Sequence, residues 1–411
     1  MTHHEFDIVI IGAGPAGATL ALSLAHTGLR IAVFDKARFP RDVICGDALS
    51  GQVLNVLRRM PDNIYHDFLR DVPKTPSWGI RFHSPGNHPL ELPYLTAQTG
   101  DEDPPGYISP RLAFDHFLQE RISRYPSINM FEGEAATAVN RLSDAVEIRT
   151  TNRIVRAQLV AGADGIRSLV RKSLSIRTLD KSYYCLAVRA YFEGVTGFHP
   201  QNFIDLYYLK DLLPAYLWIF PEVEGRANVG LGLPYPMVIR DRLSLKQVLE
   251  DLITNDPVIS KRFTNANQVT PFQARGLAVH RNLKDLSGDR YLLLGDAALG
   301  VDPFSGEGIG FAMASAESAG AVILECAKTG NYNSVMLSDY DHRIDRRTRV
   351  EHSTSAAMQR YARYPWMFNL VVRRANKSRE FQKILASGFT NAKIRKKLGN
   401  PLFYLKMLMG G

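Results

Sequence analysis

Cysteine is scarce in this chain, and so is any spacing of residues that would bind a metal. The three cysteines, Cys45, Cys185 and Cys326, are an odd number at wide intervals, which excludes a disulfide framework and a cysteine zinc site. The eleven histidines show no ligand spacing, so no metal is expected. Few cysteines without pairing are typical of a reducing compartment, and we expect a cytoplasmic protein.

The only long uncharged run near the start, residues 8–25, lacks the features of a membrane span or secretion signal. No basic segment precedes it, and Gly12, Gly14, Pro15 and Gly17 interrupt it. A buried strand, a tight turn and a helix explain the run better.

Acidic residues are scarce in the C-terminal part. From Asp341 onward, 16 Lys plus Arg stand against 4 Asp plus Glu, so the basic excess of the whole chain lies there. No nucleic-acid recognition motif accompanies it, and we expect no nucleic-acid partner. Two interpretations stay open: peripheral contact with anionic headgroups at the inner face of the membrane or with an acidic redox partner, and a solvated surface with no partner.

A dinucleotide fingerprint opens the chain. Residues 6–11 are an apolar, β-branched run that suits a buried parallel strand. The glycines that follow allow a tight turn (Gly12), close approach of a pyrophosphate (Gly14) and close packing of helix on strand (Gly17). A second strand, residues 29–34, ends at Asp35, where a carboxylate can accept both hydroxyls of an adenosine ribose. The predicted nucleotide contacts in this part are Gly12, Gly14, Ala16, Gly17, Asp35 and Lys36.

Two later segments resemble the flavoprotein group that includes the aromatic hydroxylases. One is a strand and turn with Asp164, and the other is a strand ending in Gly295-Asp296, followed by Asp302-Pro303-Phe304-Ser305-Gly306-Glu307-Gly308-Ile309-Gly310. The resemblance implies FAD, held non-covalently. It implies that Asp296 contacts the ribityl or ribose region, and that the helix opening at Gly306 points N–H groups at the flavin pyrimidine edge. By the same resemblance, Arg111 lies near the phosphates. The implied FAD contacts in these later parts are Arg111, Asp164, Gly295, Asp296, Gly306, Gly308 and Ile309.

The middle of the chain narrows the resemblance. In the run Tyr216-Leu217-Trp218-Ile219-Phe220-Pro221 the three aromatic residues alternate with aliphatic ones, so a strand would place all three on one face. Together with Gly230-Leu231-Gly232 eight residues later, this spacing resembles the geranylgeranyl reductase family. The segment from Phe39 to Ser50, with its Cys45-Gly46 pair, is similar to that family's loop after the second strand. The resemblance implies a prenyl channel lined by Tyr216, Trp218 and Phe220, with Cys45 and Gly46 beside the flavin.

The fold class expected is α/β: a Rossmann-like FAD-binding domain, an interleaved β-sheet substrate domain and a helical C-terminal region. We assign residues 1–75, 106–180 and 286–345 to FAD binding, 76–105 and 181–285 to the β-rich substrate domain, and 346–411 to basic helices. Those helices are expected at 356–362, 367–377 and 380–387. The apolar segment 401–409 would cap the channel, touch a membrane or pack on the body.

One nucleotide fingerprint is found, without a second glycine set for NAD(P)H. Electrons would then come from a nicotinamide nucleotide that visits transiently, or from a protein or quinol donor. The leading hypothesis is reduction of an isoprenoid double bond on a hydrophobic small-molecule or lipid substrate, with Cys45 and Asp47 as candidate groups that orient or protonate it. For Cys45 the alternative is a small buried hydrophobe, and Asp47 qualifies only if burial raises its pKa.

Two other functions stay open. A monooxygenase or halogenase could use the same fold, but halogenases show a tryptophan at position 216 and an isoleucine at 220 and need a lysine between flavin and substrate. Lys74 is the sole lysine between Lys36 and Lys172, and its surroundings indicate a surface turn. A non-catalytic FAD-bound redox relay is the third possibility.

Overall fold

The computed structural model describes residues 5–94, 103–279, 283–388, 392–400 and 403. Its first sheet has the strand order β18-β19-β11-β1-β2-β8 with β10 and β9 beyond β11. The strands β19, β11, β1, β2 and β8 run parallel, as expected for a dinucleotide-binding sheet. The bounds are β1 Phe6–Ile11, β2 Ile31–Asp35, β8 Ile128–Glu132, β9 Ala136–Arg141, β10 Val146–Thr150, β11 Ile154–Gly162, β18 Ser287–Gly288 and β19 Tyr291–Leu293.

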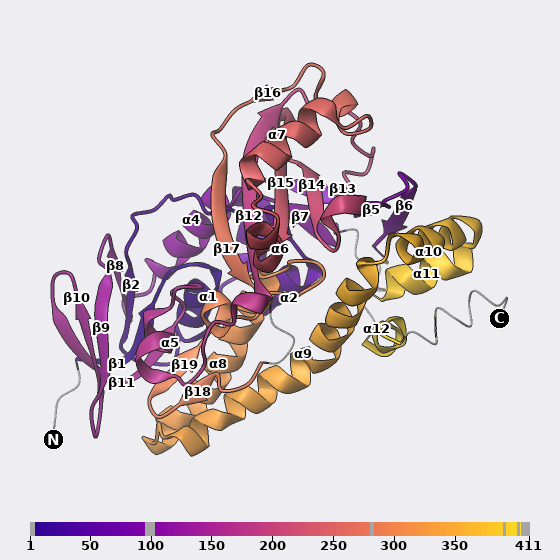
Figure 1. The fold of residues 1–411 in the computed structure, drawn as a ribbon. Helices are drawn as coiled ribbons and strands as arrows, with labels where there is room; N and C mark the ends of the chain where they lie inside the picture. Colours follow the sequence, from indigo (N-terminus) through magenta and orange to yellow (C-terminus); the bar gives the residue numbers. More distant parts are fainter. Residues whose placement is uncertain (1–4, 95–102, 280–282, 389–391, 401–402, 404–411) are drawn as a thin grey trace.

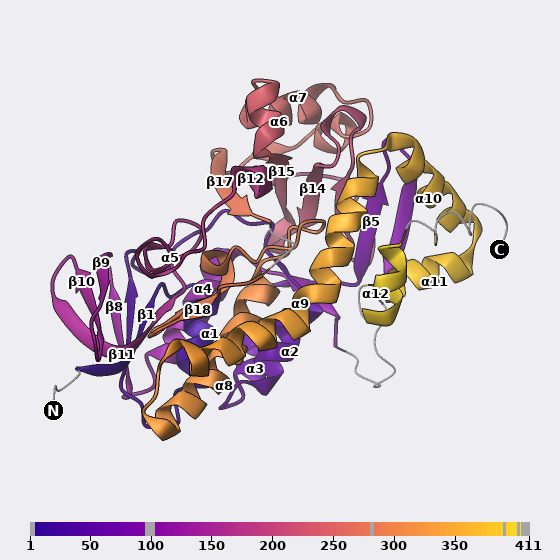
Figure 2. The same ribbon diagram turned by 60° about the horizontal axis from the view of Figure 1, so that its bottom comes forward.

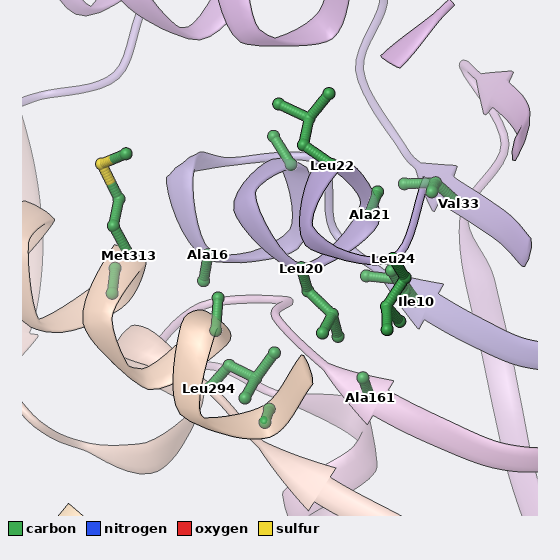
Figure 3. Packing of buried hydrophobic residues seen from close by; sticks show 14 of the residues in the cluster. Ile10, Ala16, Leu20, Ala21, Leu22, Leu24, Val33, Ala161, Leu294 and Met313 are labelled. Carbon is green, nitrogen blue, oxygen red and sulfur yellow. The ribbon is translucent and has the colours of Figure 1, made fainter. Parts of the chain in front are cut away.

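Small and aliphatic residues pack helices closely on this sheet (Figure 3). The glycine-rich turn leads into α1 (Pro15–Ser23), which packs against α8 (Ile309–Thr329) and α4 (Arg111–Ile122). The predicted strand, turn and buried helix over residues 8–25 are confirmed. By length and composition α8 could cross a membrane, but 72% of its apolar window is buried inside the protein, so it packs as a core helix.

A second, mostly antiparallel sheet stands above the first (Figure 1). Its order is β16-β12-β15-β14-β13-β5-β6, with β17 also paired to β12. The register of β14 with β15 confirms the predicted aromatic strand, with Tyr216, Trp218 and Phe220 in one hydrophobic cluster. The bounds are β5 Gly79–His83, β6 Pro89–Pro93, β12 Tyr184–Glu193, β13 Ile204–Tyr207, β14 Tyr216–Pro221, β15 Arg226–Pro234, β16 Asn267–Gln268 and β17 Gln273–Ala278.

Two helices, which the sequence analysis did not single out, cover the other face of this sheet. They are α6 (Tyr235–Arg240) and α7 (Leu245–Asn255). Leu249 is fully buried, and its neighbours Leu245, Val248 and Leu252 complete an apolar stripe against the cluster formed by Leu217, Ile219 and Leu231. The segment 181–285, expected to be rich in strands, thus also contains helices, because this apolar stripe has the spacing of a helix face.

A small third sheet and two helices connect the two larger sheets. Its order is β3 (Ala48–Leu49), β7 (Gly106–Ile108), β4 (Thr75–Ser77). Helices α2 (Gly51–Arg59) and α3 (Ile64–Asp71) lie between β3 and β4 in the chain. The segment from Phe39 to Ser50 therefore leaves the nucleotide sheet and reaches the second sheet, where it can contact both.

The C-terminal part is helical as expected, but its first helix is much longer. Helix α9 runs from Ser334 to Ala362, and α10 (Pro365–Lys377), α11 (Arg379–Ser387) and α12 (Ala392–Leu398) follow. Figure 2 shows α9 passing from the nucleotide sheet toward β5 and the terminal helices. The predicted segment 401–409 lies outside the described residues except for Phe403, which packs against the cluster of α11.

Candidate flavin and substrate site

A single large cavity of about 2230 Å³ brings most of the predicted site residues together. It reaches from the carboxyl ends of β1 and β2 to the aromatic face of β14. Its lining includes the predicted residues Gly12, Gly14, Ala16, Asp35, Lys36, Cys45, Gly46, Arg111, Asp164, Tyr216, Trp218, Phe220, Asp296, Gly306, Gly308 and Ile309. Gly17, Asp47 and Gly295 lie behind this wall rather than in it.

The glycine turn has the geometry that the fingerprint requires. Gly12 has φ +99°, and a Cβ there would lie 2.3 Å from the carbonyl oxygen of Ala163. A Cβ on Gly17 would lie 1.8 Å from the carbonyl oxygen of Gly12, so helix and turn touch directly. Helix α1 begins after Gly14 without a side-chain cap, and its first turn lines the cavity. The backbone N–H groups in the first turn of α1 therefore form a site for a diphosphate.

Asp35 ends β2 beside this turn and is buried. Its carboxylate accepts hydrogen bonds from the backbone N–H groups of Ala13 (2.8 Å) and Ala37 (2.9 Å). A carboxylate has further acceptor sites, so its place in the cavity wall still allows contact with a ribose. Sequence reasoning missed Arg41, which lines the cavity 3.8 Å from Asp35 and stacks over the ring of Phe39.

A buried ion cluster holds the next part of the wall. Arg111 binds Asp115 through two hydrogen bonds of 2.7 Å, and Arg41 binds the same carboxylate at 2.9 Å. Two guanidinium groups therefore share the Asp115 carboxylate, and both line the cavity. Their N–H donors suit the phosphates that the resemblance places near Arg111.

Two further predicted aspartates, Asp164 and Asp296, line the cavity and have different partners. Asp164 accepts a hydrogen bond from the N–H of Leu169 (2.6 Å) at the start of α5 (Leu169–Leu174), a helix that Ser168 caps, and burial raises the pKa of Asp164. Asp296 follows β19 and pairs with Arg275 of β17 at 3.1 Å. Asp296 thus connects the nucleotide sheet to the second sheet through a residue that sequence reasoning did not single out.

The turn before α8 lines the cavity between the nucleotide sheet and the aromatic strand β14. Gly306 has φ +71°, and a Cβ there would lie 2.8 Å from the hydroxyl of Tyr216. Helix α8 begins after Gly308, two residues later than expected, and one of its first N–H groups is taken by a side chain: Gly310 donates to Glu307 Oε1 at 2.7 Å. Burial raises the pKa of Glu307 to about 7, so a proton is readily held at this helix end.

The aromatic wall meets the Cys45 turn closely. A Cβ on Gly46 would lie 2.8 Å from Phe220 Cε2 and 3.5 Å from Trp218 Nε1, so only glycine fits. Cys45 lines the cavity, and its pKa is raised by burial and by the charge of Asp47, which Arg111 partly offsets. Asp47 itself is fully buried and bonds to Tyr191 (2.5 Å) and Asn228 (2.6 Å) away from the cavity. Direct protonation of a substrate by Asp47 therefore has no geometric support.

The chemistry of this donor set fits FAD. The uncapped start of α1 and the Arg41–Arg111 pair suit the diphosphate, Asp35 suits the ribose, and the turn at Gly306 suits the flavin ring. The cavity exceeds the roughly 300–1,000 Å³ of common small-molecule sites, so it has room for a second molecule beside the nucleotide.

Comparison with known proteins agrees with this fit. Residues 5–356 match the family model described as FAD binding domain. The chain is 27% identical over 360 residues to the digeranylgeranylglycerophospholipid reductase of Thermoplasma volcanium, covering 84% of this chain and 85% of the relative. It is 23% identical over 384 residues to the 1H-pyrrole-2-carbonyl-[peptidyl-carrier protein] chlorinase of Pseudomonas fluorescens, covering 84% and 81%.

Among solved structures, the geranylgeranyl bacteriochlorophyll reductase-like protein of Thermoplasma acidophilum has the same fold. Its TM-score is 0.78 at 24% identity, with 96% of this chain and 98% of that chain covered. The α/β fold class expected from the sequence is confirmed, as is the resemblance to geranylgeranyl reductases. The chain belongs to the FAD binding domain family of flavoproteins and is an FAD-dependent oxidoreductase related to the geranylgeranyl reductases.

Proposed function

We propose that this protein reduces carbon–carbon double bonds of an isoprenoid chain on a hydrophobic or lipid substrate. The observation that carries the proposal is the contact of the aromatic wall with the Cys45-Gly46 turn inside the cavity that also holds the nucleotide fingerprint. The apolar part of the wall continues with Ile80, Ile204 and Leu206 of the second sheet. A prenyl chain gains about 0.8 kcal/mol for each CH₂ that it buries, so such a wall suits it.

Bound FAD, once reduced by the electron donor, would supply the hydride, and the side chains of this chain would bind and orient the substrate. Tyr216, Trp218 and Phe220 hold the chain and exclude water from the reacting carbons. Cys45 is the acid that lines the cavity at this wall, and its raised pKa keeps the proton on sulfur at neutral pH. We assign to Cys45 the proton that completes saturation, with Arg111 beside the sulfur to stabilise the thiolate that remains.

The names of the relatives support this substrate class, because the Thermoplasma volcanium protein is called a digeranylgeranylglycerophospholipid reductase. The electron donor is a nicotinamide nucleotide that visits transiently, or a protein or quinol, since no second glycine fingerprint accompanies the first.

An anaerobic half-reaction tests the proposal. The FAD-loaded protein is chemically reduced and given a geranylgeranyl lipid, while flavin absorbance and lipid mass are followed. We expect reoxidation together with a gain of two hydrogens per bond. Cys45→Ser should slow this step, whereas Cys185→Ser, a change in another cysteine of the same cavity, should leave it nearly unchanged. Reduced flavin that reacts only after air is admitted, in the presence or absence of lipid, would overturn the proposal.

Oxygen chemistry is the competing function, and the chlorinase relative favours it. However, Lys74 lies outside the cavity lining, and its ammonium donates to the carbonyls of Phe68 (3.0 Å), Leu69 (2.6 Å) and Val72 (3.0 Å). The lysine that lines the cavity is Lys36, at the ribose end. This arrangement favours reduction over halogenation, and the room beside the nucleotide disfavours a simple relay.

We also propose that the protein contacts the inner face of the cytoplasmic membrane through the start of α10. Tyr364 and Trp366 are 53% and 62% exposed, and exposed basic residues flank them. Those residues are Arg360, Arg363, Arg373, Arg374, Lys377 and Arg379. Aromatic rings at the headgroup level with arginines around them suit an anionic bilayer surface.

Sedimentation with lipid vesicles tests this contact. Binding to vesicles with anionic lipid should exceed binding to neutral ones and fall with salt. Trp366→Ser should weaken it, while Val335→Ser, which removes another exposed apolar side chain near the start of α9, should not. Equal binding of both variants, or no preference for anionic lipid, would contradict the proposal.

A further inference from the structure

The face of the second sheet behind the Cys45 turn carries an unusual set of charged groups. Register pairs Tyr191 with Asn228 and Asn228 with Phe220, so these three side chains lie in one row on the cavity side of the sheet. Arg189 lies in the next row, beside Gly230 and Trp218. Glu222, two residues after Phe220, points to the same side.

Asp47, from the segment between β2 and β3, packs against this face of the sheet. Its backbone has φ +66°, and its carboxylate Oδ2 accepts hydrogen bonds from the hydroxyl of Tyr191 (2.5 Å) and the amide of Asn228 (2.6 Å). The same Asn228 donates to the carbonyl of Cys45 (2.8 Å) and accepts from the indole of Trp218 (2.9 Å). One buried amide therefore connects the aromatic wall, the Cys45 turn and the Asp47 carboxylate.

Glu222 is the second buried carboxyl group, with 6% of its surface exposed. Asp47 Oδ1 and Glu222 Oε1 have no hydrogen-bond partner among the described residues, nor do Nε and Nη1 of Arg189. The guanidinium of Arg189 binds Asp42 instead, at 2.9 and 3.0 Å. The nearby cation for both Asp47 and Glu222 is therefore Arg189, and its hydrogen bonds already go to the Asp42 carboxylate.

Two carboxylates so placed cannot both ionise freely. Burial raises the pKa of Asp47, against the opposing effects of Arg189, Tyr191 and Asn228. Burial also raises the pKa of Glu222, and the charge of Asp47 raises it further. The two carboxyl groups are therefore coupled, since a negative charge on Asp47 raises the pKa of Glu222.

That charge lies directly behind the sulfur of Cys45. The thiol accepts a hydrogen bond from the backbone N–H of Asp47 and faces Arg111, and Asp47 is the named anion that raises its pKa. The titratable and charged groups around the turn, taken over every element that packs against it, are Asp42, Cys45, Asp47, Arg111, Cys185, Arg189, Tyr191, Tyr216, Glu222 and Arg226.

We propose that Asp47, fixed by Tyr191 and Asn228 and coupled to the buried Glu222, carries a negative charge that acts together with burial to hold Cys45 in its thiol form. These four are positioning residues, since none of them touches the cavity. Their use in catalysis rests on the proposed function, in which Cys45 gives its S–H proton to a carbon while the neighbouring carbon receives the hydride. The effect on the thiol does not depend on the substrate.

Alkylation of the FAD-loaded protein with iodoacetamide across pH tests the proposal without any substrate. Peptide mass spectrometry separates Cys45 from Cys185, which lines the same cavity and serves as the internal control. Because alkylation follows the thiolate fraction, Asp47→Asn should make Cys45 roughly tenfold more reactive at pH 8, the factor that one pKa unit carries. Asparagine tolerates the left-handed backbone at this position, so the turn is retained.

Glu222→Gln should affect Cys45 less than Asp47→Asn near pH 7 and increase its reactivity mainly at high pH, because the raised pKa of Glu222 delays its ionisation in the wild type. Glu193→Gln, an exposed carboxylate on the same sheet, should change nothing. Should Asp47→Asn lose FAD, Tyr191→Phe provides the test, with a smaller shift in the same direction. An unchanged Cys45 profile in a variant that retains FAD, or an equal shift of Cys185, would overturn the proposal. A protein that fails to reduce prenyl lipids but shows these shifts would remove only the proposed function.

Discussion

The hydroxyl of Tyr216 donates a hydrogen bond to the carbonyl of Ser305 at 2.5 Å, and so joins the aromatic strand to the turn that opens α8. The substrate wall and the flavin-side turn are thereby held in one position. We expect Tyr216→Phe to lower the free energy of unfolding by about 1 kcal/mol and to weaken turnover more than FAD binding. Denaturant titration and the anaerobic half-reaction measure the two effects.

Tyr208→Phe is the matched control for that change. The hydroxyl of Tyr208 is buried in the same cluster with no hydrogen-bond partner among the described residues, so its removal should be neutral or stabilising. Equal losses in both variants would mean that the Tyr216–Ser305 bond has no special role.

Gly17→Ala should abolish retention of FAD, because its Cβ would lie 1.8 Å from the carbonyl oxygen of Gly12. The clash must displace either the turn or α1. The ratio of flavin absorbance to protein after gel filtration measures the outcome. Gly28→Ala is the control: its φ of +78° adds backbone strain, but nothing lies within 4 Å and it is far from the cavity wall. It should lose some stability and keep FAD.

Asp205 should make stability depend on pH at the acid end. Burial opposes its ionisation, but hydrogen bonds from His83 and Arg81 and the charge of Arg262 outweigh burial and lower its pKa below the usual 3.8. Its contribution is therefore present above pH 3.8 and disappears as pH falls through the lower folded value. Asp205→Asn should cost roughly 3–5 kcal/mol at pH 7 and much less near pH 2. Asp211→Asn, on an exposed turn, should cost little at either pH in the same denaturant titrations.

Glu307 should make the free energy of unfolding depend on pH in the opposite direction to Asp205. Burial raises its pKa from 4.5 to about 7, so the folded protein binds a proton more readily than the unfolded chain. The free energy of unfolding should then fall as pH rises from about 4.5 to about 7, and Glu307→Gln should flatten this region. Glu317, further along α8, provides the comparison, because Arg59 and Arg347 outweigh burial and lower its pKa. Glu317→Gln should change stability above pH 4.5 and leave the Glu307 slope intact.

Lys74→Met separates the two kinds of flavin chemistry. The change removes an ammonium from three carbonyls at the end of α3, and we expect a loss of roughly 1–2 kcal/mol in stability. FAD content and reductive turnover should be retained, as they should in the exposed control Lys181→Met. Loss of turnover with full FAD content would revive the halogenase interpretation.

Local patterns made much of this architecture predictable. The glycine fingerprint and the alternating aromatic strand depend on neighbours in the sequence, and both are found where they were expected. Helix α7 was missed although Leu245, Val248, Leu249 and Leu252 have helical spacing. The start of α9 was missed too, although Asn333 caps it by accepting a hydrogen bond from the N–H of Met336.

The groups behind the Cys45 turn could not be found from sequence. Tyr191 belongs to β12 and Asn228 to β15, while Glu222 directly follows β14, and only the pairing of these strands brings the three residues to Asp47. Asp47 itself was singled out, but the side to which its carboxylate turns depends on the left-handed backbone at that residue. The same holds for Arg41, whose neighbours Asp35 and Asp115 are far apart in the chain.

The strand order of the nucleotide sheet has a consequence for how the protein is made. Strand β1 is synthesised well before two strands of the same sheet, because its neighbour β11 begins at Ile154 and β19 joins that strand only at Tyr291. Helix α8, which covers α1, is complete only at Thr329. The sides of β1 and α1 that face β11 and α8 therefore stay uncovered until those later segments are made, and apolar surface exposed in this way promotes aggregation of a nascent chain.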